Sequence, residues 1–421
     1  MPEVFVLLPY FDFPYASPES LSDGSYVIAT YLASGISVSD AIRRSGTFAV
    51  GQSIGTWIDV PGITREMISK YQARVLGCYC VQTTDEAAYL LRIAFPIENF
   101  GSCYSMLFTA LMGNDTSTAL NTRLIDIETA NDASGFFKGP RKGIDYLREL
   151  TGVKNRPLIL NMLKPCIGYS PEYGAKLFYE AGRGGIDLIK DDELLGSTSF
   201  SQVVERVRAY NLQAQRIYDE TGKRPVYIAN ITAKPKTMRE NARACLDAGV
   251  KAVMVNFVST GLDALSEICD EFGNQLFILA HYAGCDVVSK GVGIPVILGK
   301  LPRMAGADGV VVMYQKDRNN SGYSDFIRTM QAHRLPCCGM KQTVSVIGGG
   351  VSPLCAAELY NDFGKDMVLG VGGAIQGHPD GASAGARAML RSVEAAIKGV
   401  DIDEAASECP ELAKAIECWR K

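Results

Sequence analysis

The sequence predicts an α/β protein in which a smaller α+β domain of the ferredoxin-like type precedes a (β/α)8 barrel. Eight short apolar runs follow one another after Gly143, and longer segments separate them. Several of these separating segments have helical periodicity. The chain of 421 residues is long enough for one large domain plus a smaller one. A doubly wound open sheet is the alternative, but eight consecutive strand–helix units favour a closed barrel.

The first domain is predicted at residues 1–145, where strand-like and helix-like pieces alternate without a regular repeat. Runs rich in β-branched and aromatic residues predict strands, and helical spacing of apolar residues predicts helices. The predicted strands are Tyr26–Leu32, Arg74–Gln82 and Tyr89–Phe95, and the predicted helices are Ser37–Arg44 and Tyr104–Met112.

The barrel, with C-terminal helices, is predicted at residues 146–421. Its eight predicted strands are Pro157–Leu163, Ile186–Lys190, Val226–Ile231, Ala252–Phe257, Phe277–His281, Gly309–Tyr314, Thr343–Ile347 and Val368–Gly373. The clearest helices between them are Tyr173–Ala181, Phe200–Thr221, Lys236–Ala248 and Leu262–Phe272.

The composition excludes several kinds of partner. A hydrophobic fraction of 47% and a charged fraction of 21% are typical of a globular protein with a sizeable core. The net charge of -4, spread along the chain, indicates no nucleic-acid partner and no anionic membrane. The N-terminal VFVLLPYF is a poor signal peptide, and no apolar run approaches the ~20 residues that span a bilayer. We therefore expect a cytoplasmic protein.

The twelve cysteines are scattered, without a CxxC pair or a Cys/His zinc spacing. In a long chain with a good core, this pattern favours free, buried thiols in a reducing compartment over a disulfide framework.

A run of charge, Lys190-Asp191-Asp192-Glu193, ends the second predicted barrel strand. Barrels carry their chemistry at the C-terminal ends of the strands. Carboxylates at such an end are hard oxygen ligands that suit Mg²⁺. The alternative is a solvated turn before a helix N-terminus, where the helix dipole favours acidic residues.

Other strand ends carry polar groups or glycines that would meet at the same rim. Glycine pairs after the seventh and eighth strands are where barrels commonly bind phosphate through backbone N–H groups. This convergence favours an active site with a metal, two lysines, a histidine and a phosphate cradle. The groups are Lys164, Asn230, Thr232, Asn256, His281, Tyr314 and Lys316 near the end of the sixth strand, Gly348-Gly349-Gly350 and Gly372-Gly373.

The three histidines differ in their context. His281 ends a predicted strand and is expected to act as an acid/base, although a rim histidine with satisfied hydrogen bonds is the alternative. His378, in GHPDG, is expected to order the loop behind the cradle, and His333 is expected at the surface.

Four segments resemble the large subunit of RuBisCO: LNMLKPCIGYS around Lys164, GGIDLIKDDE around Lys190, GGGV at 348–351 and VGGAIQGHPDG at Val371–Gly381. In the first half, GQSIGTW and FTALMGN resemble the substrate-contacting segments of its N-terminal domain. The resemblance therefore covers nearly the whole chain.

The resemblance implies a homodimer with shared active sites, in which Thr56, Trp57 and Asn114 reach into the partner's barrel. It also implies that CO₂ carbamylates Lys190, which then binds Mg²⁺ together with Asp192 and Glu193. A lysine ammonium cannot ligate a cation, so a carbamate makes chemical sense of Lys190 as a ligand. Lys164 would act as an acid/base or polarising group, and Gly349, Gly350, Gly372 and Gly373 would bind phosphate.

The departures from carboxylating members are equally informative. Those members have charged or polar residues at five positions, and this chain has Gly51, Cys166, Tyr282, Val311 and Gly348 there. The resemblance is therefore to a RuBisCO-like protein of form IV that does not fix CO₂ on ribulose bisphosphate. In the carboxylases, the groups lost at Tyr282, Val311 and Gly348 line the half of the site for a second phosphate, so we expect a substrate with one phosphate. Cys166 is expected to be a small apolar filler. Lys316 and Arg318 lie near the position of the carboxylases' mobile-loop lysine, but without its glycine context.

The retained residues favour enolate or enediolate chemistry, by isomerisation or decarboxylation, on a phosphorylated keto sugar or sugar acid. One alternative is the methionine-salvage 2,3-diketo-5-methylthiopentyl-1-phosphate enolase, in which a lysine base stands where this chain has Asn114. The other alternative is a non-catalytic regulatory or redox-responsive protein on the same scaffold.

Overall fold

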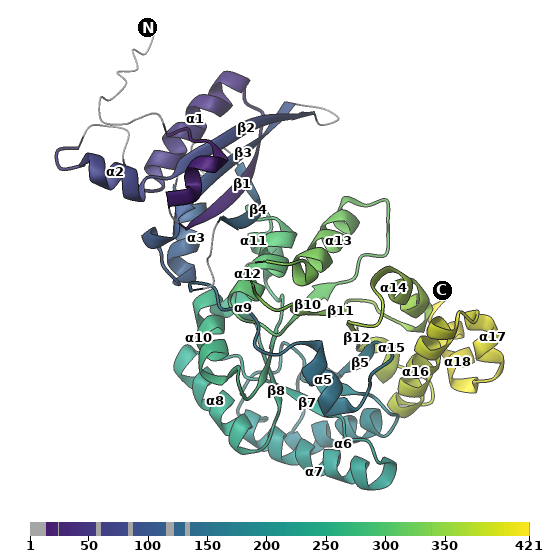
Figure 1. Cartoon of the computed structure of the whole chain (residues 1–421). Coiled ribbons are helices and arrows are strands. Elements are labelled where there is room, and N and C mark those ends of the chain that lie inside the picture. Colours follow the sequence, from purple (N-terminus) through teal and green to yellow (C-terminus); the bar gives the residue numbers. More distant parts are fainter. Residues whose placement is uncertain are drawn as a thin grey trace. The chain divides into compact units, whose positions relative to one another are not determined.

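The structure is a computed structural model that describes residues 14–23, 25–55, 60–82, 87–114, 122–130, 135–337 and 339–420. The chain divides into two compact units (Figure 1). The first contains the described residues up to Lys138, together with Cys285–Leu301 and Pro336–Met340. The second contains Gly139–Gly284, Pro302–Leu335 and the residues from Lys341 onward.

The first unit is built on a four-stranded antiparallel sheet with the order β2-β3-β1-β4. Its strands are β1 (Tyr26–Ser34), β2 (Arg74–Gln82), β3 (Ala87–Pro96) and β4 (Thr122–Ala130), and its main helices are α1 (Val38–Gly51), α2 (Arg65–Tyr71) and α3 (Tyr104–Met112). With α1 between β1 and β2 and α3 between β3 and β4, this is the split β-α-β arrangement of a ferredoxin-like domain. The predicted α+β fold is confirmed.

Aromatic side chains fix α1 against the sheet of the first unit. Tyr31 of β1 and Phe48 of α1 pack edge to face with ring centroids 5.2 Å apart, and Phe48 meets Phe95 of β3 in the same way. All three are buried, so they form the centre of this core. Ser37 caps α1 by accepting a hydrogen bond from the backbone N–H of Asp40.

The sequence analysis missed β4, the edge strand of this sheet. Its charged residues do not have the apolar alternation of a half-buried strand, and Glu128 pairs with Arg92 of β3 at 2.7 Å. Charged side chains are typical of edge strands, because they discourage pairing with another chain.

The second unit is a closed barrel of eight parallel strands in the order β10-β11-β12-β5-β6-β7-β8-β9, so the open-sheet alternative is wrong. Its strands are β5 (Leu158–Met162), β6 (Leu188–Lys190), β7 (Val226–Asn230), β8 (Ala252–Val255), β9 (Phe277–Ala280), β10 (Gly309–Met313), β11 (Val344–Gly348) and β12 (Val368–Val371). Its longer helices are α5 (Ile144–Thr151), α6 (Pro171–Gly182), α7 (Val203–Thr221), α8 (Pro235–Asp247), α10 (Leu262–Phe272), α13 (Ser321–Arg334), α14 (Ala356–Phe363), α16 (Ala382–Lys398) and α18 (Pro410–Trp419). Its short helices are α9 (Phe257–Thr260), α12 (Leu301–Met304), α15 (Gly373–Gln376) and α17 (Ile402–Ser407).

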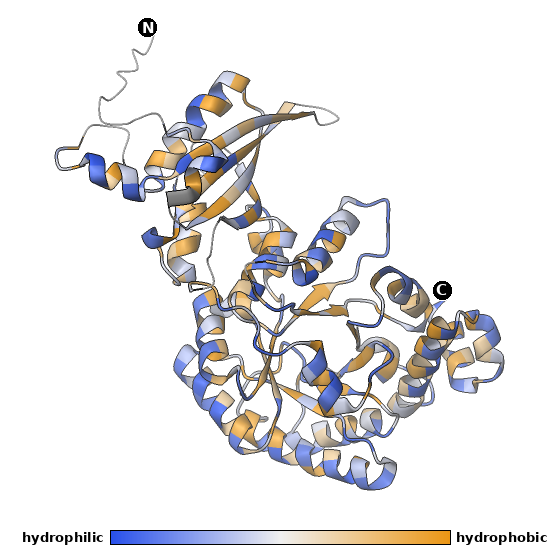
Figure 2. Ribbon diagram, viewed as in Figure 1, coloured by the Kyte–Doolittle hydropathy of each residue, from blue (hydrophilic) through white to orange (hydrophobic). Residues whose placement is uncertain are grey.

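Alternate residues of the barrel strands form one apolar core. Leu158 and Leu160 of β5, and Phe277 and Leu279 of β9, are completely buried members of it, two residues apart on each strand. Leu147 of α5 packs into the same cluster. In Figure 2 the barrel strands are mostly hydrophobic, whereas the helices around them mix hydrophilic and hydrophobic residues. The apolar interior leaves the polar strand ends as the place for chemistry.

Within the described residues, no helix is both long and apolar enough to cross a membrane. The described cysteines form no disulfide with one another, as the scattered spacing predicts. Only some of them are buried, among them Cys245, Cys269 and Cys355, whereas Cys80 is exposed.

Candidate active site

A lysine and an aspartate from neighbouring strands begin the site. Lys164 follows β5 and Asp192 follows β6, and the Lys164 ammonium donates a hydrogen bond of 2.6 Å to Asp192 Oδ2. Burial alone would lower the pKa of Lys164, but its contacts with Asp192 and Cys166 raise it above its ordinary value. The same hydrogen bond lowers the pKa of Asp192 against the effect of burial. Lys164 is thus a cation held ready to donate a hydrogen bond.

Lys190, the last residue of β6, is completely buried. Its Nζ donates 2.9 Å to the backbone oxygen of Asp191 and lies 3.4 Å from Glu193 Oε2. Burial lowers the pKa of the Lys190 ammonium, although Glu193 and Asp192 act in the opposite direction. The buried amine therefore lies beside the Glu193 carboxylate, and the charge of Asp192 acts on its pKa.

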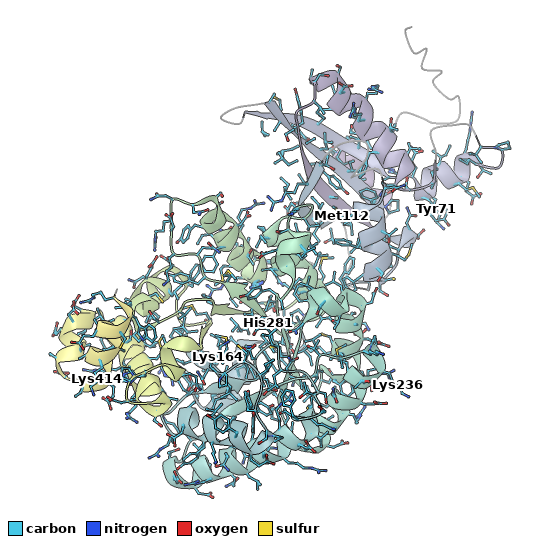
Figure 3. The ribbon with its side chains drawn as sticks, turned by 180° about the vertical axis from the view of Figure 1, so that it is seen from behind. Tyr71, Met112, Lys164, Lys236, His281 and Lys414 are labelled. Atoms are coloured by element: carbon cyan, nitrogen blue, oxygen red, sulfur yellow. The ribbon has the colours of Figure 1, made fainter. Side chains whose placement is uncertain are left out.

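His281 follows β9 and reaches the same glutamate. Its Nε2 lies 3.4 Å from Glu193 Oε2, and its Nδ1 accepts a hydrogen bond from the backbone N–H of Ala283. The neutral ring therefore carries its proton on Nε2. Burial lowers the pKa of His281 well below its ordinary value. Figure 3 shows Lys164 and His281 among the barrel strands.

Two asparagines hold the loop that carries the acidic groups. Asn230, at the end of β7, donates its side-chain amide to the backbone oxygens of Asp192 and Glu193. The side-chain amide of Asn256, after β8, donates a hydrogen bond of 2.9 Å to the backbone oxygen of Glu193. The strand-end position of both asparagines predicted their presence at the rim, and the structure adds that they position the loop.

Asp191 points away from the rim, into a buried network that the sequence analysis did not predict. Its Oδ2 accepts hydrogen bonds from Arg206 of α7, from the Tyr227 hydroxyl at 2.7 Å and from the Asn230 backbone N–H. The side chains of Asp191 and Arg206 are both completely buried. This network fixes the backbone between Lys190 and Asp192, so Asp191 is a structural residue of the site.

The glycine pairs lie at the ends of β11 and β12. Gly349 and Gly350 have φ angles of 84° and 85°, which side chains rarely adopt, and a Cβ on Gly349 would meet Met313 Cγ at 3.0 Å. A Cβ on Gly372 would lie 3.5 Å from Lys164 Cε. The turn at Gly349 and Gly350 therefore requires glycine, and Gly372 of the other pair is adjacent to Lys164. Gly373 begins α15 with nothing within 4 Å of its Cβ direction.

Apolar side chains occupy the space above Gly348. A Cβ there would lie 3.7 Å from Val311 and 3.9 Å from the Met162 methyl group. Tyr282 stacks on His281, with ring centroids 4.8 Å apart. The side chains next to Gly348 are therefore apolar, and Val311 is itself part of the buried barrel core.

The remaining predicted residues have different outcomes. Asn114 lies just beyond α3 in the first unit and is exposed, and Thr56 and Trp57 lie outside the described residues. His378 orders its loop as predicted, since Nε2 donates to the Glu411 oxygen and Nδ1 accepts from the Asp380 N–H.

Two minor expectations were wrong. His333 is completely buried and contacts the Ser345 hydroxyl at 2.9 Å, because this face of α13 packs on β11. Cys166 is no apolar filler, because its sulfur accepts a hydrogen bond of 3.0 Å from Lys164.

The donor set fits Mg²⁺ under one condition. No three histidine, cysteine, aspartate or glutamate side chains gather as a metal site in the described ranges. Asp192 and Glu193 provide two carboxylates, and the third group beside them is the Lys190 amine. A carbamate on Lys190 would complete three anionic oxygen donors, which is the ligand type that Mg²⁺ prefers.

Comparison with known families agrees with this fold. The family model for the ribulose bisphosphate carboxylase large chain, catalytic domain, matches residues 143–419, and that for its N-terminal domain matches residues 15–132. The chain therefore belongs to the RuBisCO large-chain family.

Among its relatives, a ribulose bisphosphate carboxylase-like protein from Archaeoglobus fulgidus is 38% identical over 97% of each chain. A 2,3-diketo-5-methylthiopentyl-1-phosphate enolase from Geobacillus thermodenitrificans is 31% identical, with 94% of this chain and 98% of the relative covered. The solved dimeric archaeal RuBisCO from Hyperthermus butylicus is 31% identical with a TM-score of 0.84, covering 94% of this chain and 96% of the other. These three relatives are a RuBisCO-like protein, an enolase and a RuBisCO.

Proposed function

We propose that this protein is a non-carboxylating enzyme of the RuBisCO family. It forms an enolate or enediolate from a phosphorylated keto sugar or sugar acid, by isomerisation or by decarboxylation. The observation that supports this most directly is the chain of contacts Lys164–Asp192 and Lys190–Glu193–His281 at one rim, beside the glycine turns.

The metal that this site would hold is Mg²⁺, bound by carbamylated Lys190, Asp192 and Glu193. When bound, it would polarise the substrate's ketone and stabilise the negative charge that develops on its oxygen. Carbamylation by CO₂ is part of the proposal, because an uncharged or cationic amine leaves the donor set one oxygen short.

The other roles in the proposed reaction belong to side chains of the barrel rim. Lys164 donates a hydrogen bond to the oxyanion that develops on the substrate. Its ammonium already donates to the Asp192 carboxylate, so it lies beside a proposed ligand of the metal that would polarise the substrate's ketone. His281 is the proposed acid/base residue, and in its neutral form the Nε2–H, which faces the site, donates a hydrogen bond to a substrate oxygen. Asn230 and Asn256 hold the Asp192–Glu193 loop in place during both steps.

The substrate should carry one phosphate and a less polar opposite end. Gly349, Gly350, Gly372 and Gly373 offer backbone groups for the phosphate. The side chains next to Gly348 are those of Val311 and Met162. Neither is charged, so neither can pair with a second phosphate. Ribulose bisphosphate therefore fits this rim poorly.

The proposed assembly is a homodimer, in which Asn114, Thr56 and Trp57 of one subunit complete the site of the other. The dimeric relative from Hyperthermus butylicus supports this arrangement. The absence of disulfides between the described cysteines is in keeping with a reducing cytoplasm, where we place the protein.

The methionine-salvage enolase remains the second candidate, because a relative with that name matches almost the whole chain. This chain has Asn114 where that enolase has its lysine base, which argues against the enolase assignment.

Proton exchange tests the proposal. The wild-type protein, Mg²⁺ and bicarbonate would be incubated in deuterated water with a panel of keto-sugar and sugar-acid phosphates, including the salvage substrate, and followed by NMR. We expect deuterium at the carbon beside the ketone, or loss of CO₂, in wild type and neither in Lys164→Met. Carboxylation of ribulose bisphosphate, or inactivity toward the whole panel, would contradict the proposal, and the latter would favour a binding protein.

A further inference from the structure

A lysine that forms no ion pair within the described part of the chain lies at the glycine turn after β11. A Cβ built on Gly350 would be 3.7 Å from both Cε and Nζ of Lys316, which follows β10. Lys316 is exposed and forms no ion pair with any described residue. A full positive charge is therefore available beside one of the two glycine turns.

The backbone around Lys316 is fixed by contacts that do not use its ammonium. The Tyr314 backbone N–H donates a hydrogen bond of 2.7 Å to the backbone oxygen of Gly348, and the Tyr314 hydroxyl donates one to the Glu358 carboxylate of α14. On the other side, Arg318 pairs with Glu358 at 3.0 Å and with Asp362 at 2.7 Å. Residues 314–318 are thus anchored at both ends, and the nearby arginine is neutralised.

The other glycine turn has a lysine that is already engaged. Lys164 lies beside Gly372, but its ammonium is bound to Asp192 at 2.6 Å. Backbone N–H groups carry only partial charges, whereas a phosphate group carries about -1.5 to -2 at neutral pH. In the structure, where Lys164 is paired with Asp192, Lys316 is the lysine at the cradle whose ammonium has no carboxylate partner among the described residues.

We propose that Lys316 binds the substrate's phosphate at the Gly349–Gly350 turn, and so selects phosphorylated over unphosphorylated substrates. This inference rests on the proposed function, because it presupposes a phosphorylated substrate. Charge-assisted hydrogen bonds from a lysine to a phosphate oxygen are among the stronger polar contacts, so the residue should dominate affinity at this end of the ligand.

Inorganic phosphate is the probe, and calorimetric titration of the full chain, with Mg²⁺ and bicarbonate present, gives its dissociation constant. Three variants are compared with wild type: Lys316→Met, Lys316→Arg and Lys398→Met. Lys398 is an exposed lysine at the C-terminal end of α16, so its substitution makes the same charge change far from the strand ends that form the rim. We expect Lys316→Met to weaken phosphate binding by about 10- to 100-fold, as for a lost hydrogen bond to a charged group. Lys316→Arg should keep most of the affinity, and Lys398→Met all of it.

Two results would overturn the inference, and they have different meanings. If wild type and Lys316→Met bind phosphate equally, the assignment of Lys316 is wrong while the phosphate site and the proposed function stand. If wild type does not bind phosphate at all, the phosphorylated substrate is wrong, and the role of Lys316 falls with it. Circular dichroism of Lys316→Met verifies that a loss of binding does not reflect misfolding.

Discussion

The Lys164 ammonium lies 2.6 Å from Asp192 Oδ2, and this pair joins the ends of two neighbouring barrel strands. Asp192 is also one of the two carboxylates that would hold Mg²⁺. In the proposed Mg²⁺ site, Lys164 and the metal would therefore compete for the same oxygen. The lysine would keep a buried carboxylate paired before the metal binds, and its ammonium would become available to the substrate afterwards.

Removing this competitor should strengthen metal binding. In Lys164→Met, we expect the affinity for Mg²⁺ in the presence of bicarbonate to rise by about tenfold, because a positive charge close to the ligand is lost in a half-buried site. Turnover should disappear in the same variant. Competition with Mn²⁺, followed by electron paramagnetic resonance, measures the affinity. Weaker metal binding would mean that Lys164 positions Asp192 and does not compete with the metal.

The buried pair of Asp191 and Arg206 should be important for stability. Arg206→Met leaves Asp191 charged and buried, which costs about 3–5 kcal/mol in proteins where such a pair has been broken. Arg216→Met is the matched control, since Arg216 is on the same helix α7 but forms an exposed pair with Glu220. It should leave the free energy of unfolding nearly unchanged. Urea unfolding of both variants checks this, and similar stabilities would show that the network contributes little.

Asp308 makes the stability depend on pH. Burial raises its pKa to about 6, although the backbone N–H groups of Ile278, Lys142 and Arg141 donate to it. Because the folded-state pKa lies above the unfolded value of about 4, the native state holds the proton more tightly between these values. The stabilisation is complete below about pH 4 and is lost as the pH rises through about 6.

The Asp308→Asn variant isolates this effect. The unfolding free energy of wild type minus that of the variant should fall by roughly 2–3 kcal/mol from about pH 4 to about pH 7, because only the wild type loses this stabilisation. Denaturant unfolding over this range measures it. A difference that is constant, or that grows with pH, would show that the three N–H donors outweigh burial.

Repeating patterns made most of the fold predictable. Eight apolar strands with helices between them indicate a barrel, and even α10 and α3 have the bounds that periodicity predicts. The edge strand β4 was missed because its charged residues hide the alternation. His333 was placed at the surface because a polar residue gives no sign of which helix face it occupies, whereas its side chain is buried against Ser345.

The site was predictable as a set of strand ends, but the direction of each side chain was not. In the run after β6, Asp191, Asp192 and Glu193 are alike in chemistry. Only the fold shows that Asp191 turns inward to Arg206 while Asp192 meets Lys164. The partner Arg206 lies fifteen residues along the chain, on a helix, and no local pattern joins the two.

The central claim is that Lys190 carries CO₂ and so completes a Mg²⁺ site with Asp192 and Glu193. Incubation with ¹³C-bicarbonate and Mg²⁺, followed by carbon NMR of the protein, tests it most directly, with Lys190→Met as the control. The account predicts one carbamate signal per chain in wild type, strengthened by Mg²⁺ and absent from Lys190→Met. Wild-type protein that turns over substrate without a carbamate signal, or a signal that persists in Lys190→Met, would contradict it.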